Sequence, residues 1–290
     1  MSTAALIERF LAGELAGTEA PDEAAWYGLW CGADLGALPP PIAALHGGLL
    51  ADRLAWVFVA GYQAAVRSVF PEVPSTGWAA YVATEDKEDP RAHPGTTLRR
   101  DGDGWRLNGY KHWVAQSRNV DHLVVTVNDD GDDVRCLLVD RRQSGVDLSH
   151  REEPGFLAAM SQGFARFDDV EITADRVLTG DRVRLFGHTE PPFVMLAATG
   201  FLLGRLQDAD PGLSDDLAAL ALALAAACQA PPVPRQLLAG LDRSLQQGIE
   251  RFAAVVDTDA LPDWAADRRL LAMYSPRLQR HGGRPEEEGT

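Results

Sequence analysis

The sequence predicts a multidomain α+β protein in which a middle β-barrel domain stands between an N-terminal helical domain and a C-terminal helical bundle. Apolar residues recur at helical spacing between residues 4 and 16. After Gly77, short apolar runs alternate with glycine- and aspartate-rich turns, as in a compact barrel or sandwich. From about Arg184, segments of helical length return. The predicted domains are therefore residues 1–76, 77–183 and 184–290.

Two main helices are expected in the N-terminal domain. The first spans residues 4–16, where Leu6, Phe10 and Leu11 fall on one face. The second spans about residues 51–69, and the prolines that follow it end the helix.

The middle domain is expected to consist of short strands joined by tight turns. The sequence DGDG at residues 101–104 is a strong turn signal between two strands, and the acidic stretch 128–133 separates another pair. The predicted strands are residues 79–83, 96–100, 105–108, 122–127, 134–140, 164–167 and 170–172.

The C-terminal domain is expected to be a bundle of helices. Ser214 is predicted to cap one of them, because Asp215 and Asp216 then lie at the positive end of the helix dipole. The predicted helices are residues 192–208, 214–229, 234–256 and 262–280.

Composition restricts the range of partners. A net charge of −15 disfavours binding to nucleic acid or to an anionic membrane surface. The three cysteines have neither zinc-ligand nor disulfide spacing, and the seven histidines share no metal spacing, so no metal is expected. The most apolar stretch, residues 217–228, is too short to span a bilayer, and no secretory signal is apparent. We expect a cytoplasmic protein.

Four short motifs follow one another in the middle of the chain. They are YVATE at residues 81–85, GDGWRLNG at 102–109, KHWV at 111–114 and FDDV at 167–170. This order resembles the middle domain of acyl-CoA dehydrogenases, which carries VTEP, G-LNG-K-WI(T/S) and F-DV-VP segments. Weaker similarity extends to the flanks, at Gly47–Gly48, residues 189–204 and residues 267–274.

This resemblance implies a flavoprotein. In the family, FAD lies between the barrel and the C-terminal helices. A carboxylate removes a proton from the α-carbon of an acyl-CoA thioester, and the flavin takes a hydride from the β-carbon. The implied ligand is an acyl-CoA or another acyl thioester, with a role in fatty acid metabolism, and the implied assembly is an oligomer. The residues implied to contact the cofactor are Tyr81, Ala83, Thr84, Trp113, Val114 and Ala115.

The catalytic base implied by the resemblance is Glu190. The family's usual catalytic Glu follows a Tyr, and a gapless alignment places Ser275 at that position. Some family members instead carry the Glu at the start of the first C-terminal helix, where Glu190 lies with a comparable distance to Gly200. The alternative is that Glu190, next to a Thr189 cap, is a first-turn acid that only stabilises the helix dipole.

Several departures from the family leave a second interpretation open. The glycine-rich loop after the VTEP strand is replaced by DKEDPR at residues 86–91, and Ala115 stands where the family has Thr or Ser. The family's FAD phosphate and adenine motifs are absent between residues 207 and 264. The chain is therefore either an active homodimeric dehydrogenase or a non-catalytic member without FAD. The latter would pair with a full-length relative or bind an acyl thioester.

Overall fold

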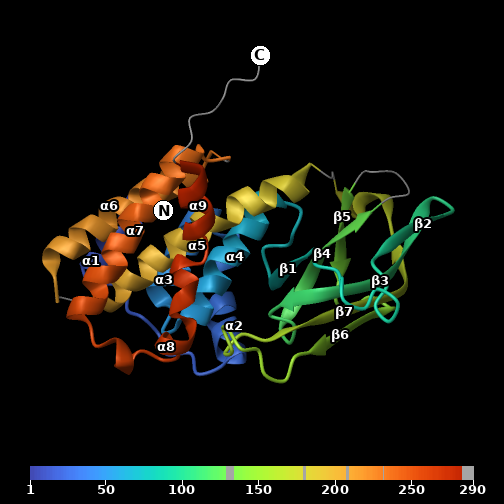
Figure 1. Cartoon of the computed structure of the whole chain (residues 1–290), viewed down its shortest axis with the longest axis horizontal. Coiled ribbons are helices and arrows are strands. Elements are labelled where there is room, and N and C mark those ends of the chain that lie inside the picture. Colours follow the sequence, from blue (N-terminus) through green and yellow to red (C-terminus); the bar gives the residue numbers. More distant parts are fainter. Residues whose placement is uncertain (129–133, 179–180, 207–208, 231, 283–290) are drawn as a thin grey trace, which may run out of the picture. The chain divides into compact units, whose positions relative to one another are not determined.

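The computed structural model describes residues 1–128, 134–178, 181–206, 209–230 and 232–282, which form two compact units. The helical unit comprises residues 1–20, 38–65 and 188–290. The sheet unit comprises residues 21–37 and 66–187. The N-terminal helices are thus divided between the units (Figure 1). Part of the predicted acidic turn, residues 129–133, lies outside the described residues.

Glycines set the packing of the helical unit. Around α5 (Arg182–Leu206) pack α3 (Pro40–Leu50) and α4 (Leu54–Val69). A Cβ atom on Gly48 would lie 2.1 Å from the carbonyl oxygen of Ala197, and one on Gly61 would lie 2.5 Å from the Cα of Val194. The backbones therefore touch where a side chain would hold them apart. The remaining α-helices of this unit are α1 (Thr3–Leu11), α6 (Pro211–Cys228), α7 (Arg235–Val255), α8 (Trp264–Asp267) and α9 (Ser275–Gly282).

The first C-terminal helix was expected to begin at residue 192, and this prediction was wrong. Helix α5 begins at Arg182 and carries Pro191 and Pro192 in its interior. Each proline removes one backbone N–H from the helical hydrogen-bond ladder, which normally favours a helix start. The boundary between the two units falls just before these prolines, at residues 187 and 188.

Two further helix predictions need correction. Asp210, not Ser214, caps α6, because its side chain accepts a hydrogen bond of 2.9 Å from the backbone N–H of Leu213 and Pro211 occupies the first turn. The helix predicted over residues 262–280 is broken into α8, a 3₁₀ turn (Arg268–Ala272) and α9. Pro276 is tolerated only in the first turn of a helix, so the chain starts a new helix at Ser275.

Helix α6 is the one helix in the described part of the chain whose length and composition would allow it to cross a membrane. Its apolar residues divide between a buried face and an exposed face. Leu213, Leu217 and Leu224 are buried, whereas Leu222 is 43% exposed. Contacts with α1, α3 and α7 explain the buried face, so α6 is a packed helix of this unit.

The sheet unit contains α2 (Glu23–Gly32) and one mixed sheet with two arms. One arm has the order β6-β7-β3-β2, and the other joins β1, β4, β5 and β8. The arms meet where β2 pairs in parallel with β4 at Thr97 and Asn128. The strands are β1 (Trp78–Val82), β2 (Thr97–Asp101), β3 (Gly104–Ala115), β4 (Val120–Asn128), β5 (Val134–Asp140), β6 (Val146–His150), β7 (Gln162–Ile172) and β8 (Val177–Leu178).

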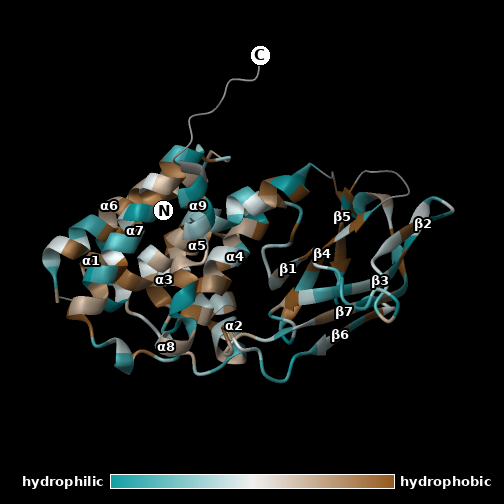
Figure 2. Ribbon diagram, in the orientation of Figure 1, coloured by the Kyte–Doolittle hydropathy of each residue, from teal (hydrophilic) through white to brown (hydrophobic). Residues whose placement is uncertain are grey.

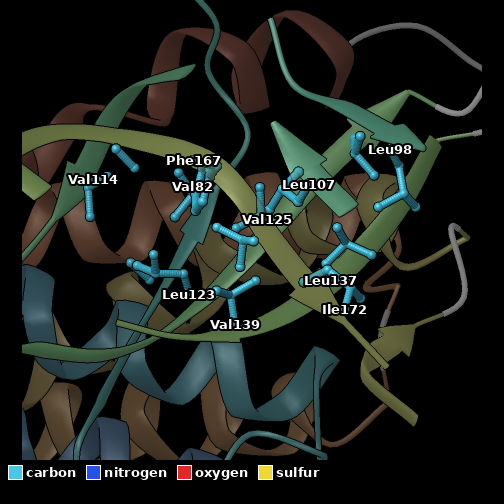
Figure 3. Close-up of a cluster of buried hydrophobic side chains, with 14 of the residues drawn as sticks. Val82, Leu98, Leu107, Val114, Leu123, Val125, Leu137, Val139, Phe167 and Ile172 are labelled. Carbon is cyan, nitrogen blue, oxygen red and sulfur yellow. The ribbon is translucent and has the colours of Figure 1, made fainter. Parts of the chain in front are cut away.

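Both arms of the sheet enclose a single apolar core. Figure 3 shows side chains from one arm, such as Leu107 and Phe167, directed toward Val125 and Leu137 of the other. Strands β4 and β5 carry long hydrophobic runs (Figure 2), as expected for strands buried on both faces. The sheet therefore folds over itself in the barrel-like manner that the sequence predicts.

The DGDG turn was predicted correctly, and some strands were not. Gly102 adopts a φ of +58°, which only glycine adopts readily, and Asp101 pairs with Gly104. The two strands predicted between residues 164 and 172 are one strand, β7. Strand β6 was missed because its solvent face is polar and only Val146 and Leu148 pack on the core.

Candidate functional site

Glu190 lies inside α5, well beyond the first turn of that helix. A first-turn role at the helix dipole is therefore wrong, and the predicted Thr189 cap is wrong for the same reason. Burial raises the pKa of the Glu190 carboxyl to about 7, and the neighbouring Tyr274 hydroxyl offsets only part of that increase. The helical unit thus holds a carboxyl group that changes charge close to neutral pH.

Tyr274 follows the 3₁₀ turn and brings a second polar group to Glu190. Its hydroxyl oxygen is buried and has no well-aligned hydrogen-bond partner among the residues that the structure describes. Burial and the nearby negative charge of Glu190 both raise the pKa of the Tyr274 phenol well above its ordinary value. Tyr62 of α4 adds a smaller effect in the same direction. The Tyr274 phenol therefore stays protonated and can donate a hydrogen bond.

The free energy of unfolding should depend on pH through Glu190. Between its ordinary pKa of 4.5 and about 7, the folded chain binds a proton that the unfolded chain has lost, so stability falls as pH rises through this window. Relative to Glu190→Gln, which cannot titrate there, the wild type should lose about 3 kcal/mol between about pH 4 and pH 8. Urea unfolding across this range measures the difference. Glu250→Gln, an exposed change in α7, should follow the wild type, and parallel curves for Glu190→Gln would contradict the expectation.

Ser275, the residue at the family's usual base position, is held in a structural network. Its hydroxyl donates a 2.7 Å hydrogen bond to Oδ1 of the buried Asp242. The other oxygen of Asp242 accepts a hydrogen bond of 2.6 Å from Gln279. These bonds join α7 to α9, so the Ser275 hydroxyl and the Asp242 carboxylate hold the two helices together.

In the sheet unit, the predicted cofactor strands converge. The backbone N–H of His112 donates a 2.7 Å hydrogen bond to the carbonyl of Thr84. Beneath them, the Lys111 ammonium lies 2.9 Å from a carboxylate oxygen of Glu85 and also contacts Thr126. This buried ion pair fixes the end of β1 against β3. Tyr81, Ala83 and Thr84 thus lie beside the segment that carries Trp113.

The individual side chains at this strand end differ in what they can offer a ligand. The exposed Thr84 hydroxyl has no hydrogen-bond partner within the described residues. The Trp113 indole is oriented by a 3.2 Å hydrogen bond to Gln162. Val114 and Ala115 are fully buried, so only their backbone could meet a cofactor. The Tyr81 ring packs 4.2 Å from Phe186, which covers part of it.

In the loop that follows Glu85, backbone N–H groups donate hydrogen bonds to carboxylates of the same loop. Asp86 Oδ1 accepts hydrogen bonds from the backbone N–H groups of Glu88 and Asp89, and these bonds lower the pKa of Asp86 to about 2. Asp89 accepts another from Ala92. These loop amides are therefore not free to hold the pyrophosphate of FAD.

Sequence reasoning missed two clusters. The Glu190–Tyr274 contact joins segments far apart in the chain, and its only signal was that both resembled catalytic positions of the family. The second cluster is Asp86 with His93 and His112, whose Nδ1 atoms lie 2.9 and 3.4 Å from the same carboxylate oxygen. The sequence offered no spacing that would link these two histidines.

Comparison with known proteins relates the middle of the chain to one protein family. The acyl-CoA dehydrogenase middle-domain family matches residues 80–170. No curated protein shows a significant sequence match. A solved structure described as an FAD-dependent dehydrogenase has 16% identity and a TM-score of 0.67, with 96% of this chain and 95% of that one covered.

Two further solved structures share the fold. FkbI, described as acting in biosynthesis of a methoxymalonyl extender unit, has 17% identity and a TM-score of 0.63, with 97% of this chain and 98% of that one covered. The prolyl acyl carrier protein oxidase AnaB has 15% identity and a TM-score of 0.63, with 89% and 88% covered. The structural similarity thus extends over both units and shows the fold that this chain shares with those proteins, and residues 80–170 resemble the acyl-CoA dehydrogenase middle domain.

Proposed function

We propose that this protein is a flavin-dependent dehydrogenase that introduces an α,β double bond into an acyl thioester. The observation that carries the proposal is Glu190, a half-buried residue whose desolvated carboxyl has a pKa raised to about 7, at a position where some family members carry their base. A base that must accept a carbon-bound proton at neutral pH works best with such a pKa.

In this mechanism Glu190 starts as the carboxylate and takes the proton from the α-carbon. Its desolvated environment makes it a stronger proton acceptor than an exposed carboxylate. The Tyr274 hydroxyl beside Glu190 would donate a hydrogen bond to the carboxylate and orient its oxygens. This hydrogen bond weakens once Glu190 is protonated. The C–H electrons at the α-carbon then form the double bond as hydride leaves the β-carbon.

A bound flavin would accept that hydride. The residues that would hold its ring system are Thr84, through its exposed hydroxyl, Ala83 and Trp113 beside it, and the backbone of Val114 and Ala115. Tyr81 would contribute its ring edge, because Phe186 covers part of the ring. Donors for an FAD pyrophosphate would have to come from outside the Asp86 loop, whose amides bind its own carboxylates.

The group that carries the acyl thioester, coenzyme A or an acyl carrier protein, is the next part of the proposal to test. AnaB is by its description an oxidase of a prolyl acyl carrier protein, so both an acyl-CoA and an acyl carrier protein thioester are candidate substrates. The purified protein should be yellow, and anaerobic addition of a substrate thioester should bleach its flavin absorbance. Bleaching by one carrier and not the other identifies the carrier. Protein that stays colourless after incubation with FAD would overturn the proposal.

The second candidate is a non-catalytic member that binds a thioester or pairs with a complete relative. It is favoured by the Asp86 loop, whose amides are bound by its own carboxylates. It predicts no flavin uptake by the isolated chain. Recovery of flavin only after co-expression with a full-length relative would support this candidate over the first.

A further inference from the structure

A cavity of about 360 Å³ lies on the outer face of the sheet unit, over β6, β7 and β3. Side chains on one face of a strand are two residues apart, so Tyr110 and His112 of β3 share this face with Phe164 of β7 and Ser149 of β6. The Asp86 loop forms one wall through Asp86 itself and His93. The volume is within the range of small-molecule sites.

The walls of this cavity are mostly aromatic. The ring centroids of His112 and Phe164 are 4.8 Å apart, and those of His93 and Tyr110 are 5.3 Å apart. Both pairs meet edge to face. The Arg151 guanidinium lies over the Phe164 ring, 4.7 Å from its centroid, so a ligand would stack on the opposite face of that ring. Rings on several sides favour a flat π system as the occupant, because aromatic stacking tolerates many ring types.

The two histidines contribute polar atoms to the cavity wall. A carboxylate only accepts hydrogen bonds, so the His93 Nδ1 atom, 2.9 Å from an Asp86 oxygen, carries the proton, while the His112 Nδ1 atom lies 3.4 Å from the same oxygen. In the neutral His93 imidazole the Nε2 atom is then an acceptor. Asp86 itself is saturated by backbone amides and imidazoles and serves to orient the rings. The ligand therefore needs N–H or O–H donors.

The charges at the rim argue against an anionic ligand. Arg166 lines the cavity, but its guanidinium lies 3.2 Å from the Asp168 carboxylate and its cross-strand neighbour is Asp147. The rim therefore has no net positive charge to attract a phosphate or carboxylate, in a chain whose net charge is −15.

We propose that this cavity binds a neutral, planar nitrogen heterocycle of nucleoside size, stacked on Phe164 and Tyr110 and hydrogen-bonded to the imidazoles of His93 and His112. The proposal rests on residues of the sheet unit alone and is independent of the dehydrogenase proposal. Its ligand would be an effector or the base of a larger molecule, and the shared chemistry is the heterocycle.

Adenosine is the probe, and isothermal titration calorimetry of the full chain is the measurement. Saturable binding is expected, and AMP should bind more weakly because the rim has no net positive charge to pair with its phosphate. Phe164→Leu removes the stacking ring and Asp86→Asn releases the histidines, and each should weaken adenosine binding by roughly tenfold. Asp101→Asn, a change at an exposed ion pair outside the cavity, should bind like the wild type.

Three outcomes would overturn the proposal. They are absence of saturable adenosine binding, AMP binding tighter than adenosine, or wild-type affinity in both Phe164→Leu and Asp86→Asn. Circular dichroism of each variant establishes whether it is folded. Phe164 and Asp86 lie in different segments around the cavity, so if one variant misfolds, the other still tests the proposal. Glu190→Gln should leave adenosine affinity unchanged, which separates this site from the thioester site.

Discussion

Glu190→Gln should lower the rate of flavin reduction by an acyl thioester between about 10²- and 10⁴-fold, the range that a positioned general base contributes. Glutamine keeps the size and hydrogen-bonding shape of the side chain, so the loss isolates proton transfer. Stopped-flow absorbance under anaerobic conditions measures the rate. Because the wild-type base is active only when deprotonated, its rate should rise with pH through a midpoint near 7.

Ser275→Ala is the matched control for this experiment. It changes the residue at the family's usual base position but removes only a hydrogen bond to Asp242. The rate of flavin reduction in Ser275→Ala should equal that of the wild type, while the free energy of unfolding should fall by about 1 kcal/mol. Wild-type rates in Glu190→Gln, or equal losses in the two variants, would remove Glu190 from the mechanism. Tyr274→Phe adds a finer readout: without its hydroxyl, the pKa of Glu190 should rise further, and the pH midpoint should move upward.

The sheet unit was the part of the fold most open to sequence reasoning. Turn residues such as Gly102 are easy to recognise in a sequence, because few residues other than glycine readily adopt their backbone conformation. Strand β6 was missed because its pairing with β7, rather than its own hydrophobicity, holds it in the sheet. The helix after residue 180 was misplaced because Pro191 and Pro192 usually mark a helix start, and packing of α5 overrode that preference.

The candidate site could be predicted only in part from the sequence, because tertiary packing decides its geometry. Glu190 was identified by resemblance, but its burial and its contact with Tyr274 depend on how distant helices pack. Thr84, just after the end of β1, and Trp113 of β3 lie in neighbouring segments, joined by the hydrogen bond from the His112 N–H to the Thr84 carbonyl. Val114 is buried because it belongs to the apolar core of the barrel. The alternation of inward and outward residues along β3 could not reveal this, because the register with β7 shifts between Lys111 and Val114.

The largest stability effect is expected at Gly48, which the sequence analysis noted only for its similarity to the family and not for any role in packing. In Gly48→Ala the new Cβ would lie 2.1 Å from the Ala197 carbonyl oxygen, and that atom belongs to the backbone of α5 and cannot rotate away. Helices α3 and α5 must then separate, which should lower the free energy of unfolding by about 3 kcal/mol or more. Gly61→Ala should act in the same direction, since its Cβ would lie 2.5 Å from the Cα of Val194.

Gly240→Ala in α7 is the matched control, because the substitution is identical and the new Cβ would meet only the mobile end of Arg243, at 3.8 Å. There the gain in helix propensity should dominate, and stability should rise by about 0.5–1 kcal/mol. Urea unfolding monitored by circular dichroism compares the three variants. Opposite signs at Gly48 and Gly240 would establish that backbone contact sets the position of α5. Since α5 carries Glu190, Gly48→Ala should also disturb the carboxyl's environment and shift the pH midpoint of catalysis toward the ordinary value of 4.5 as water enters.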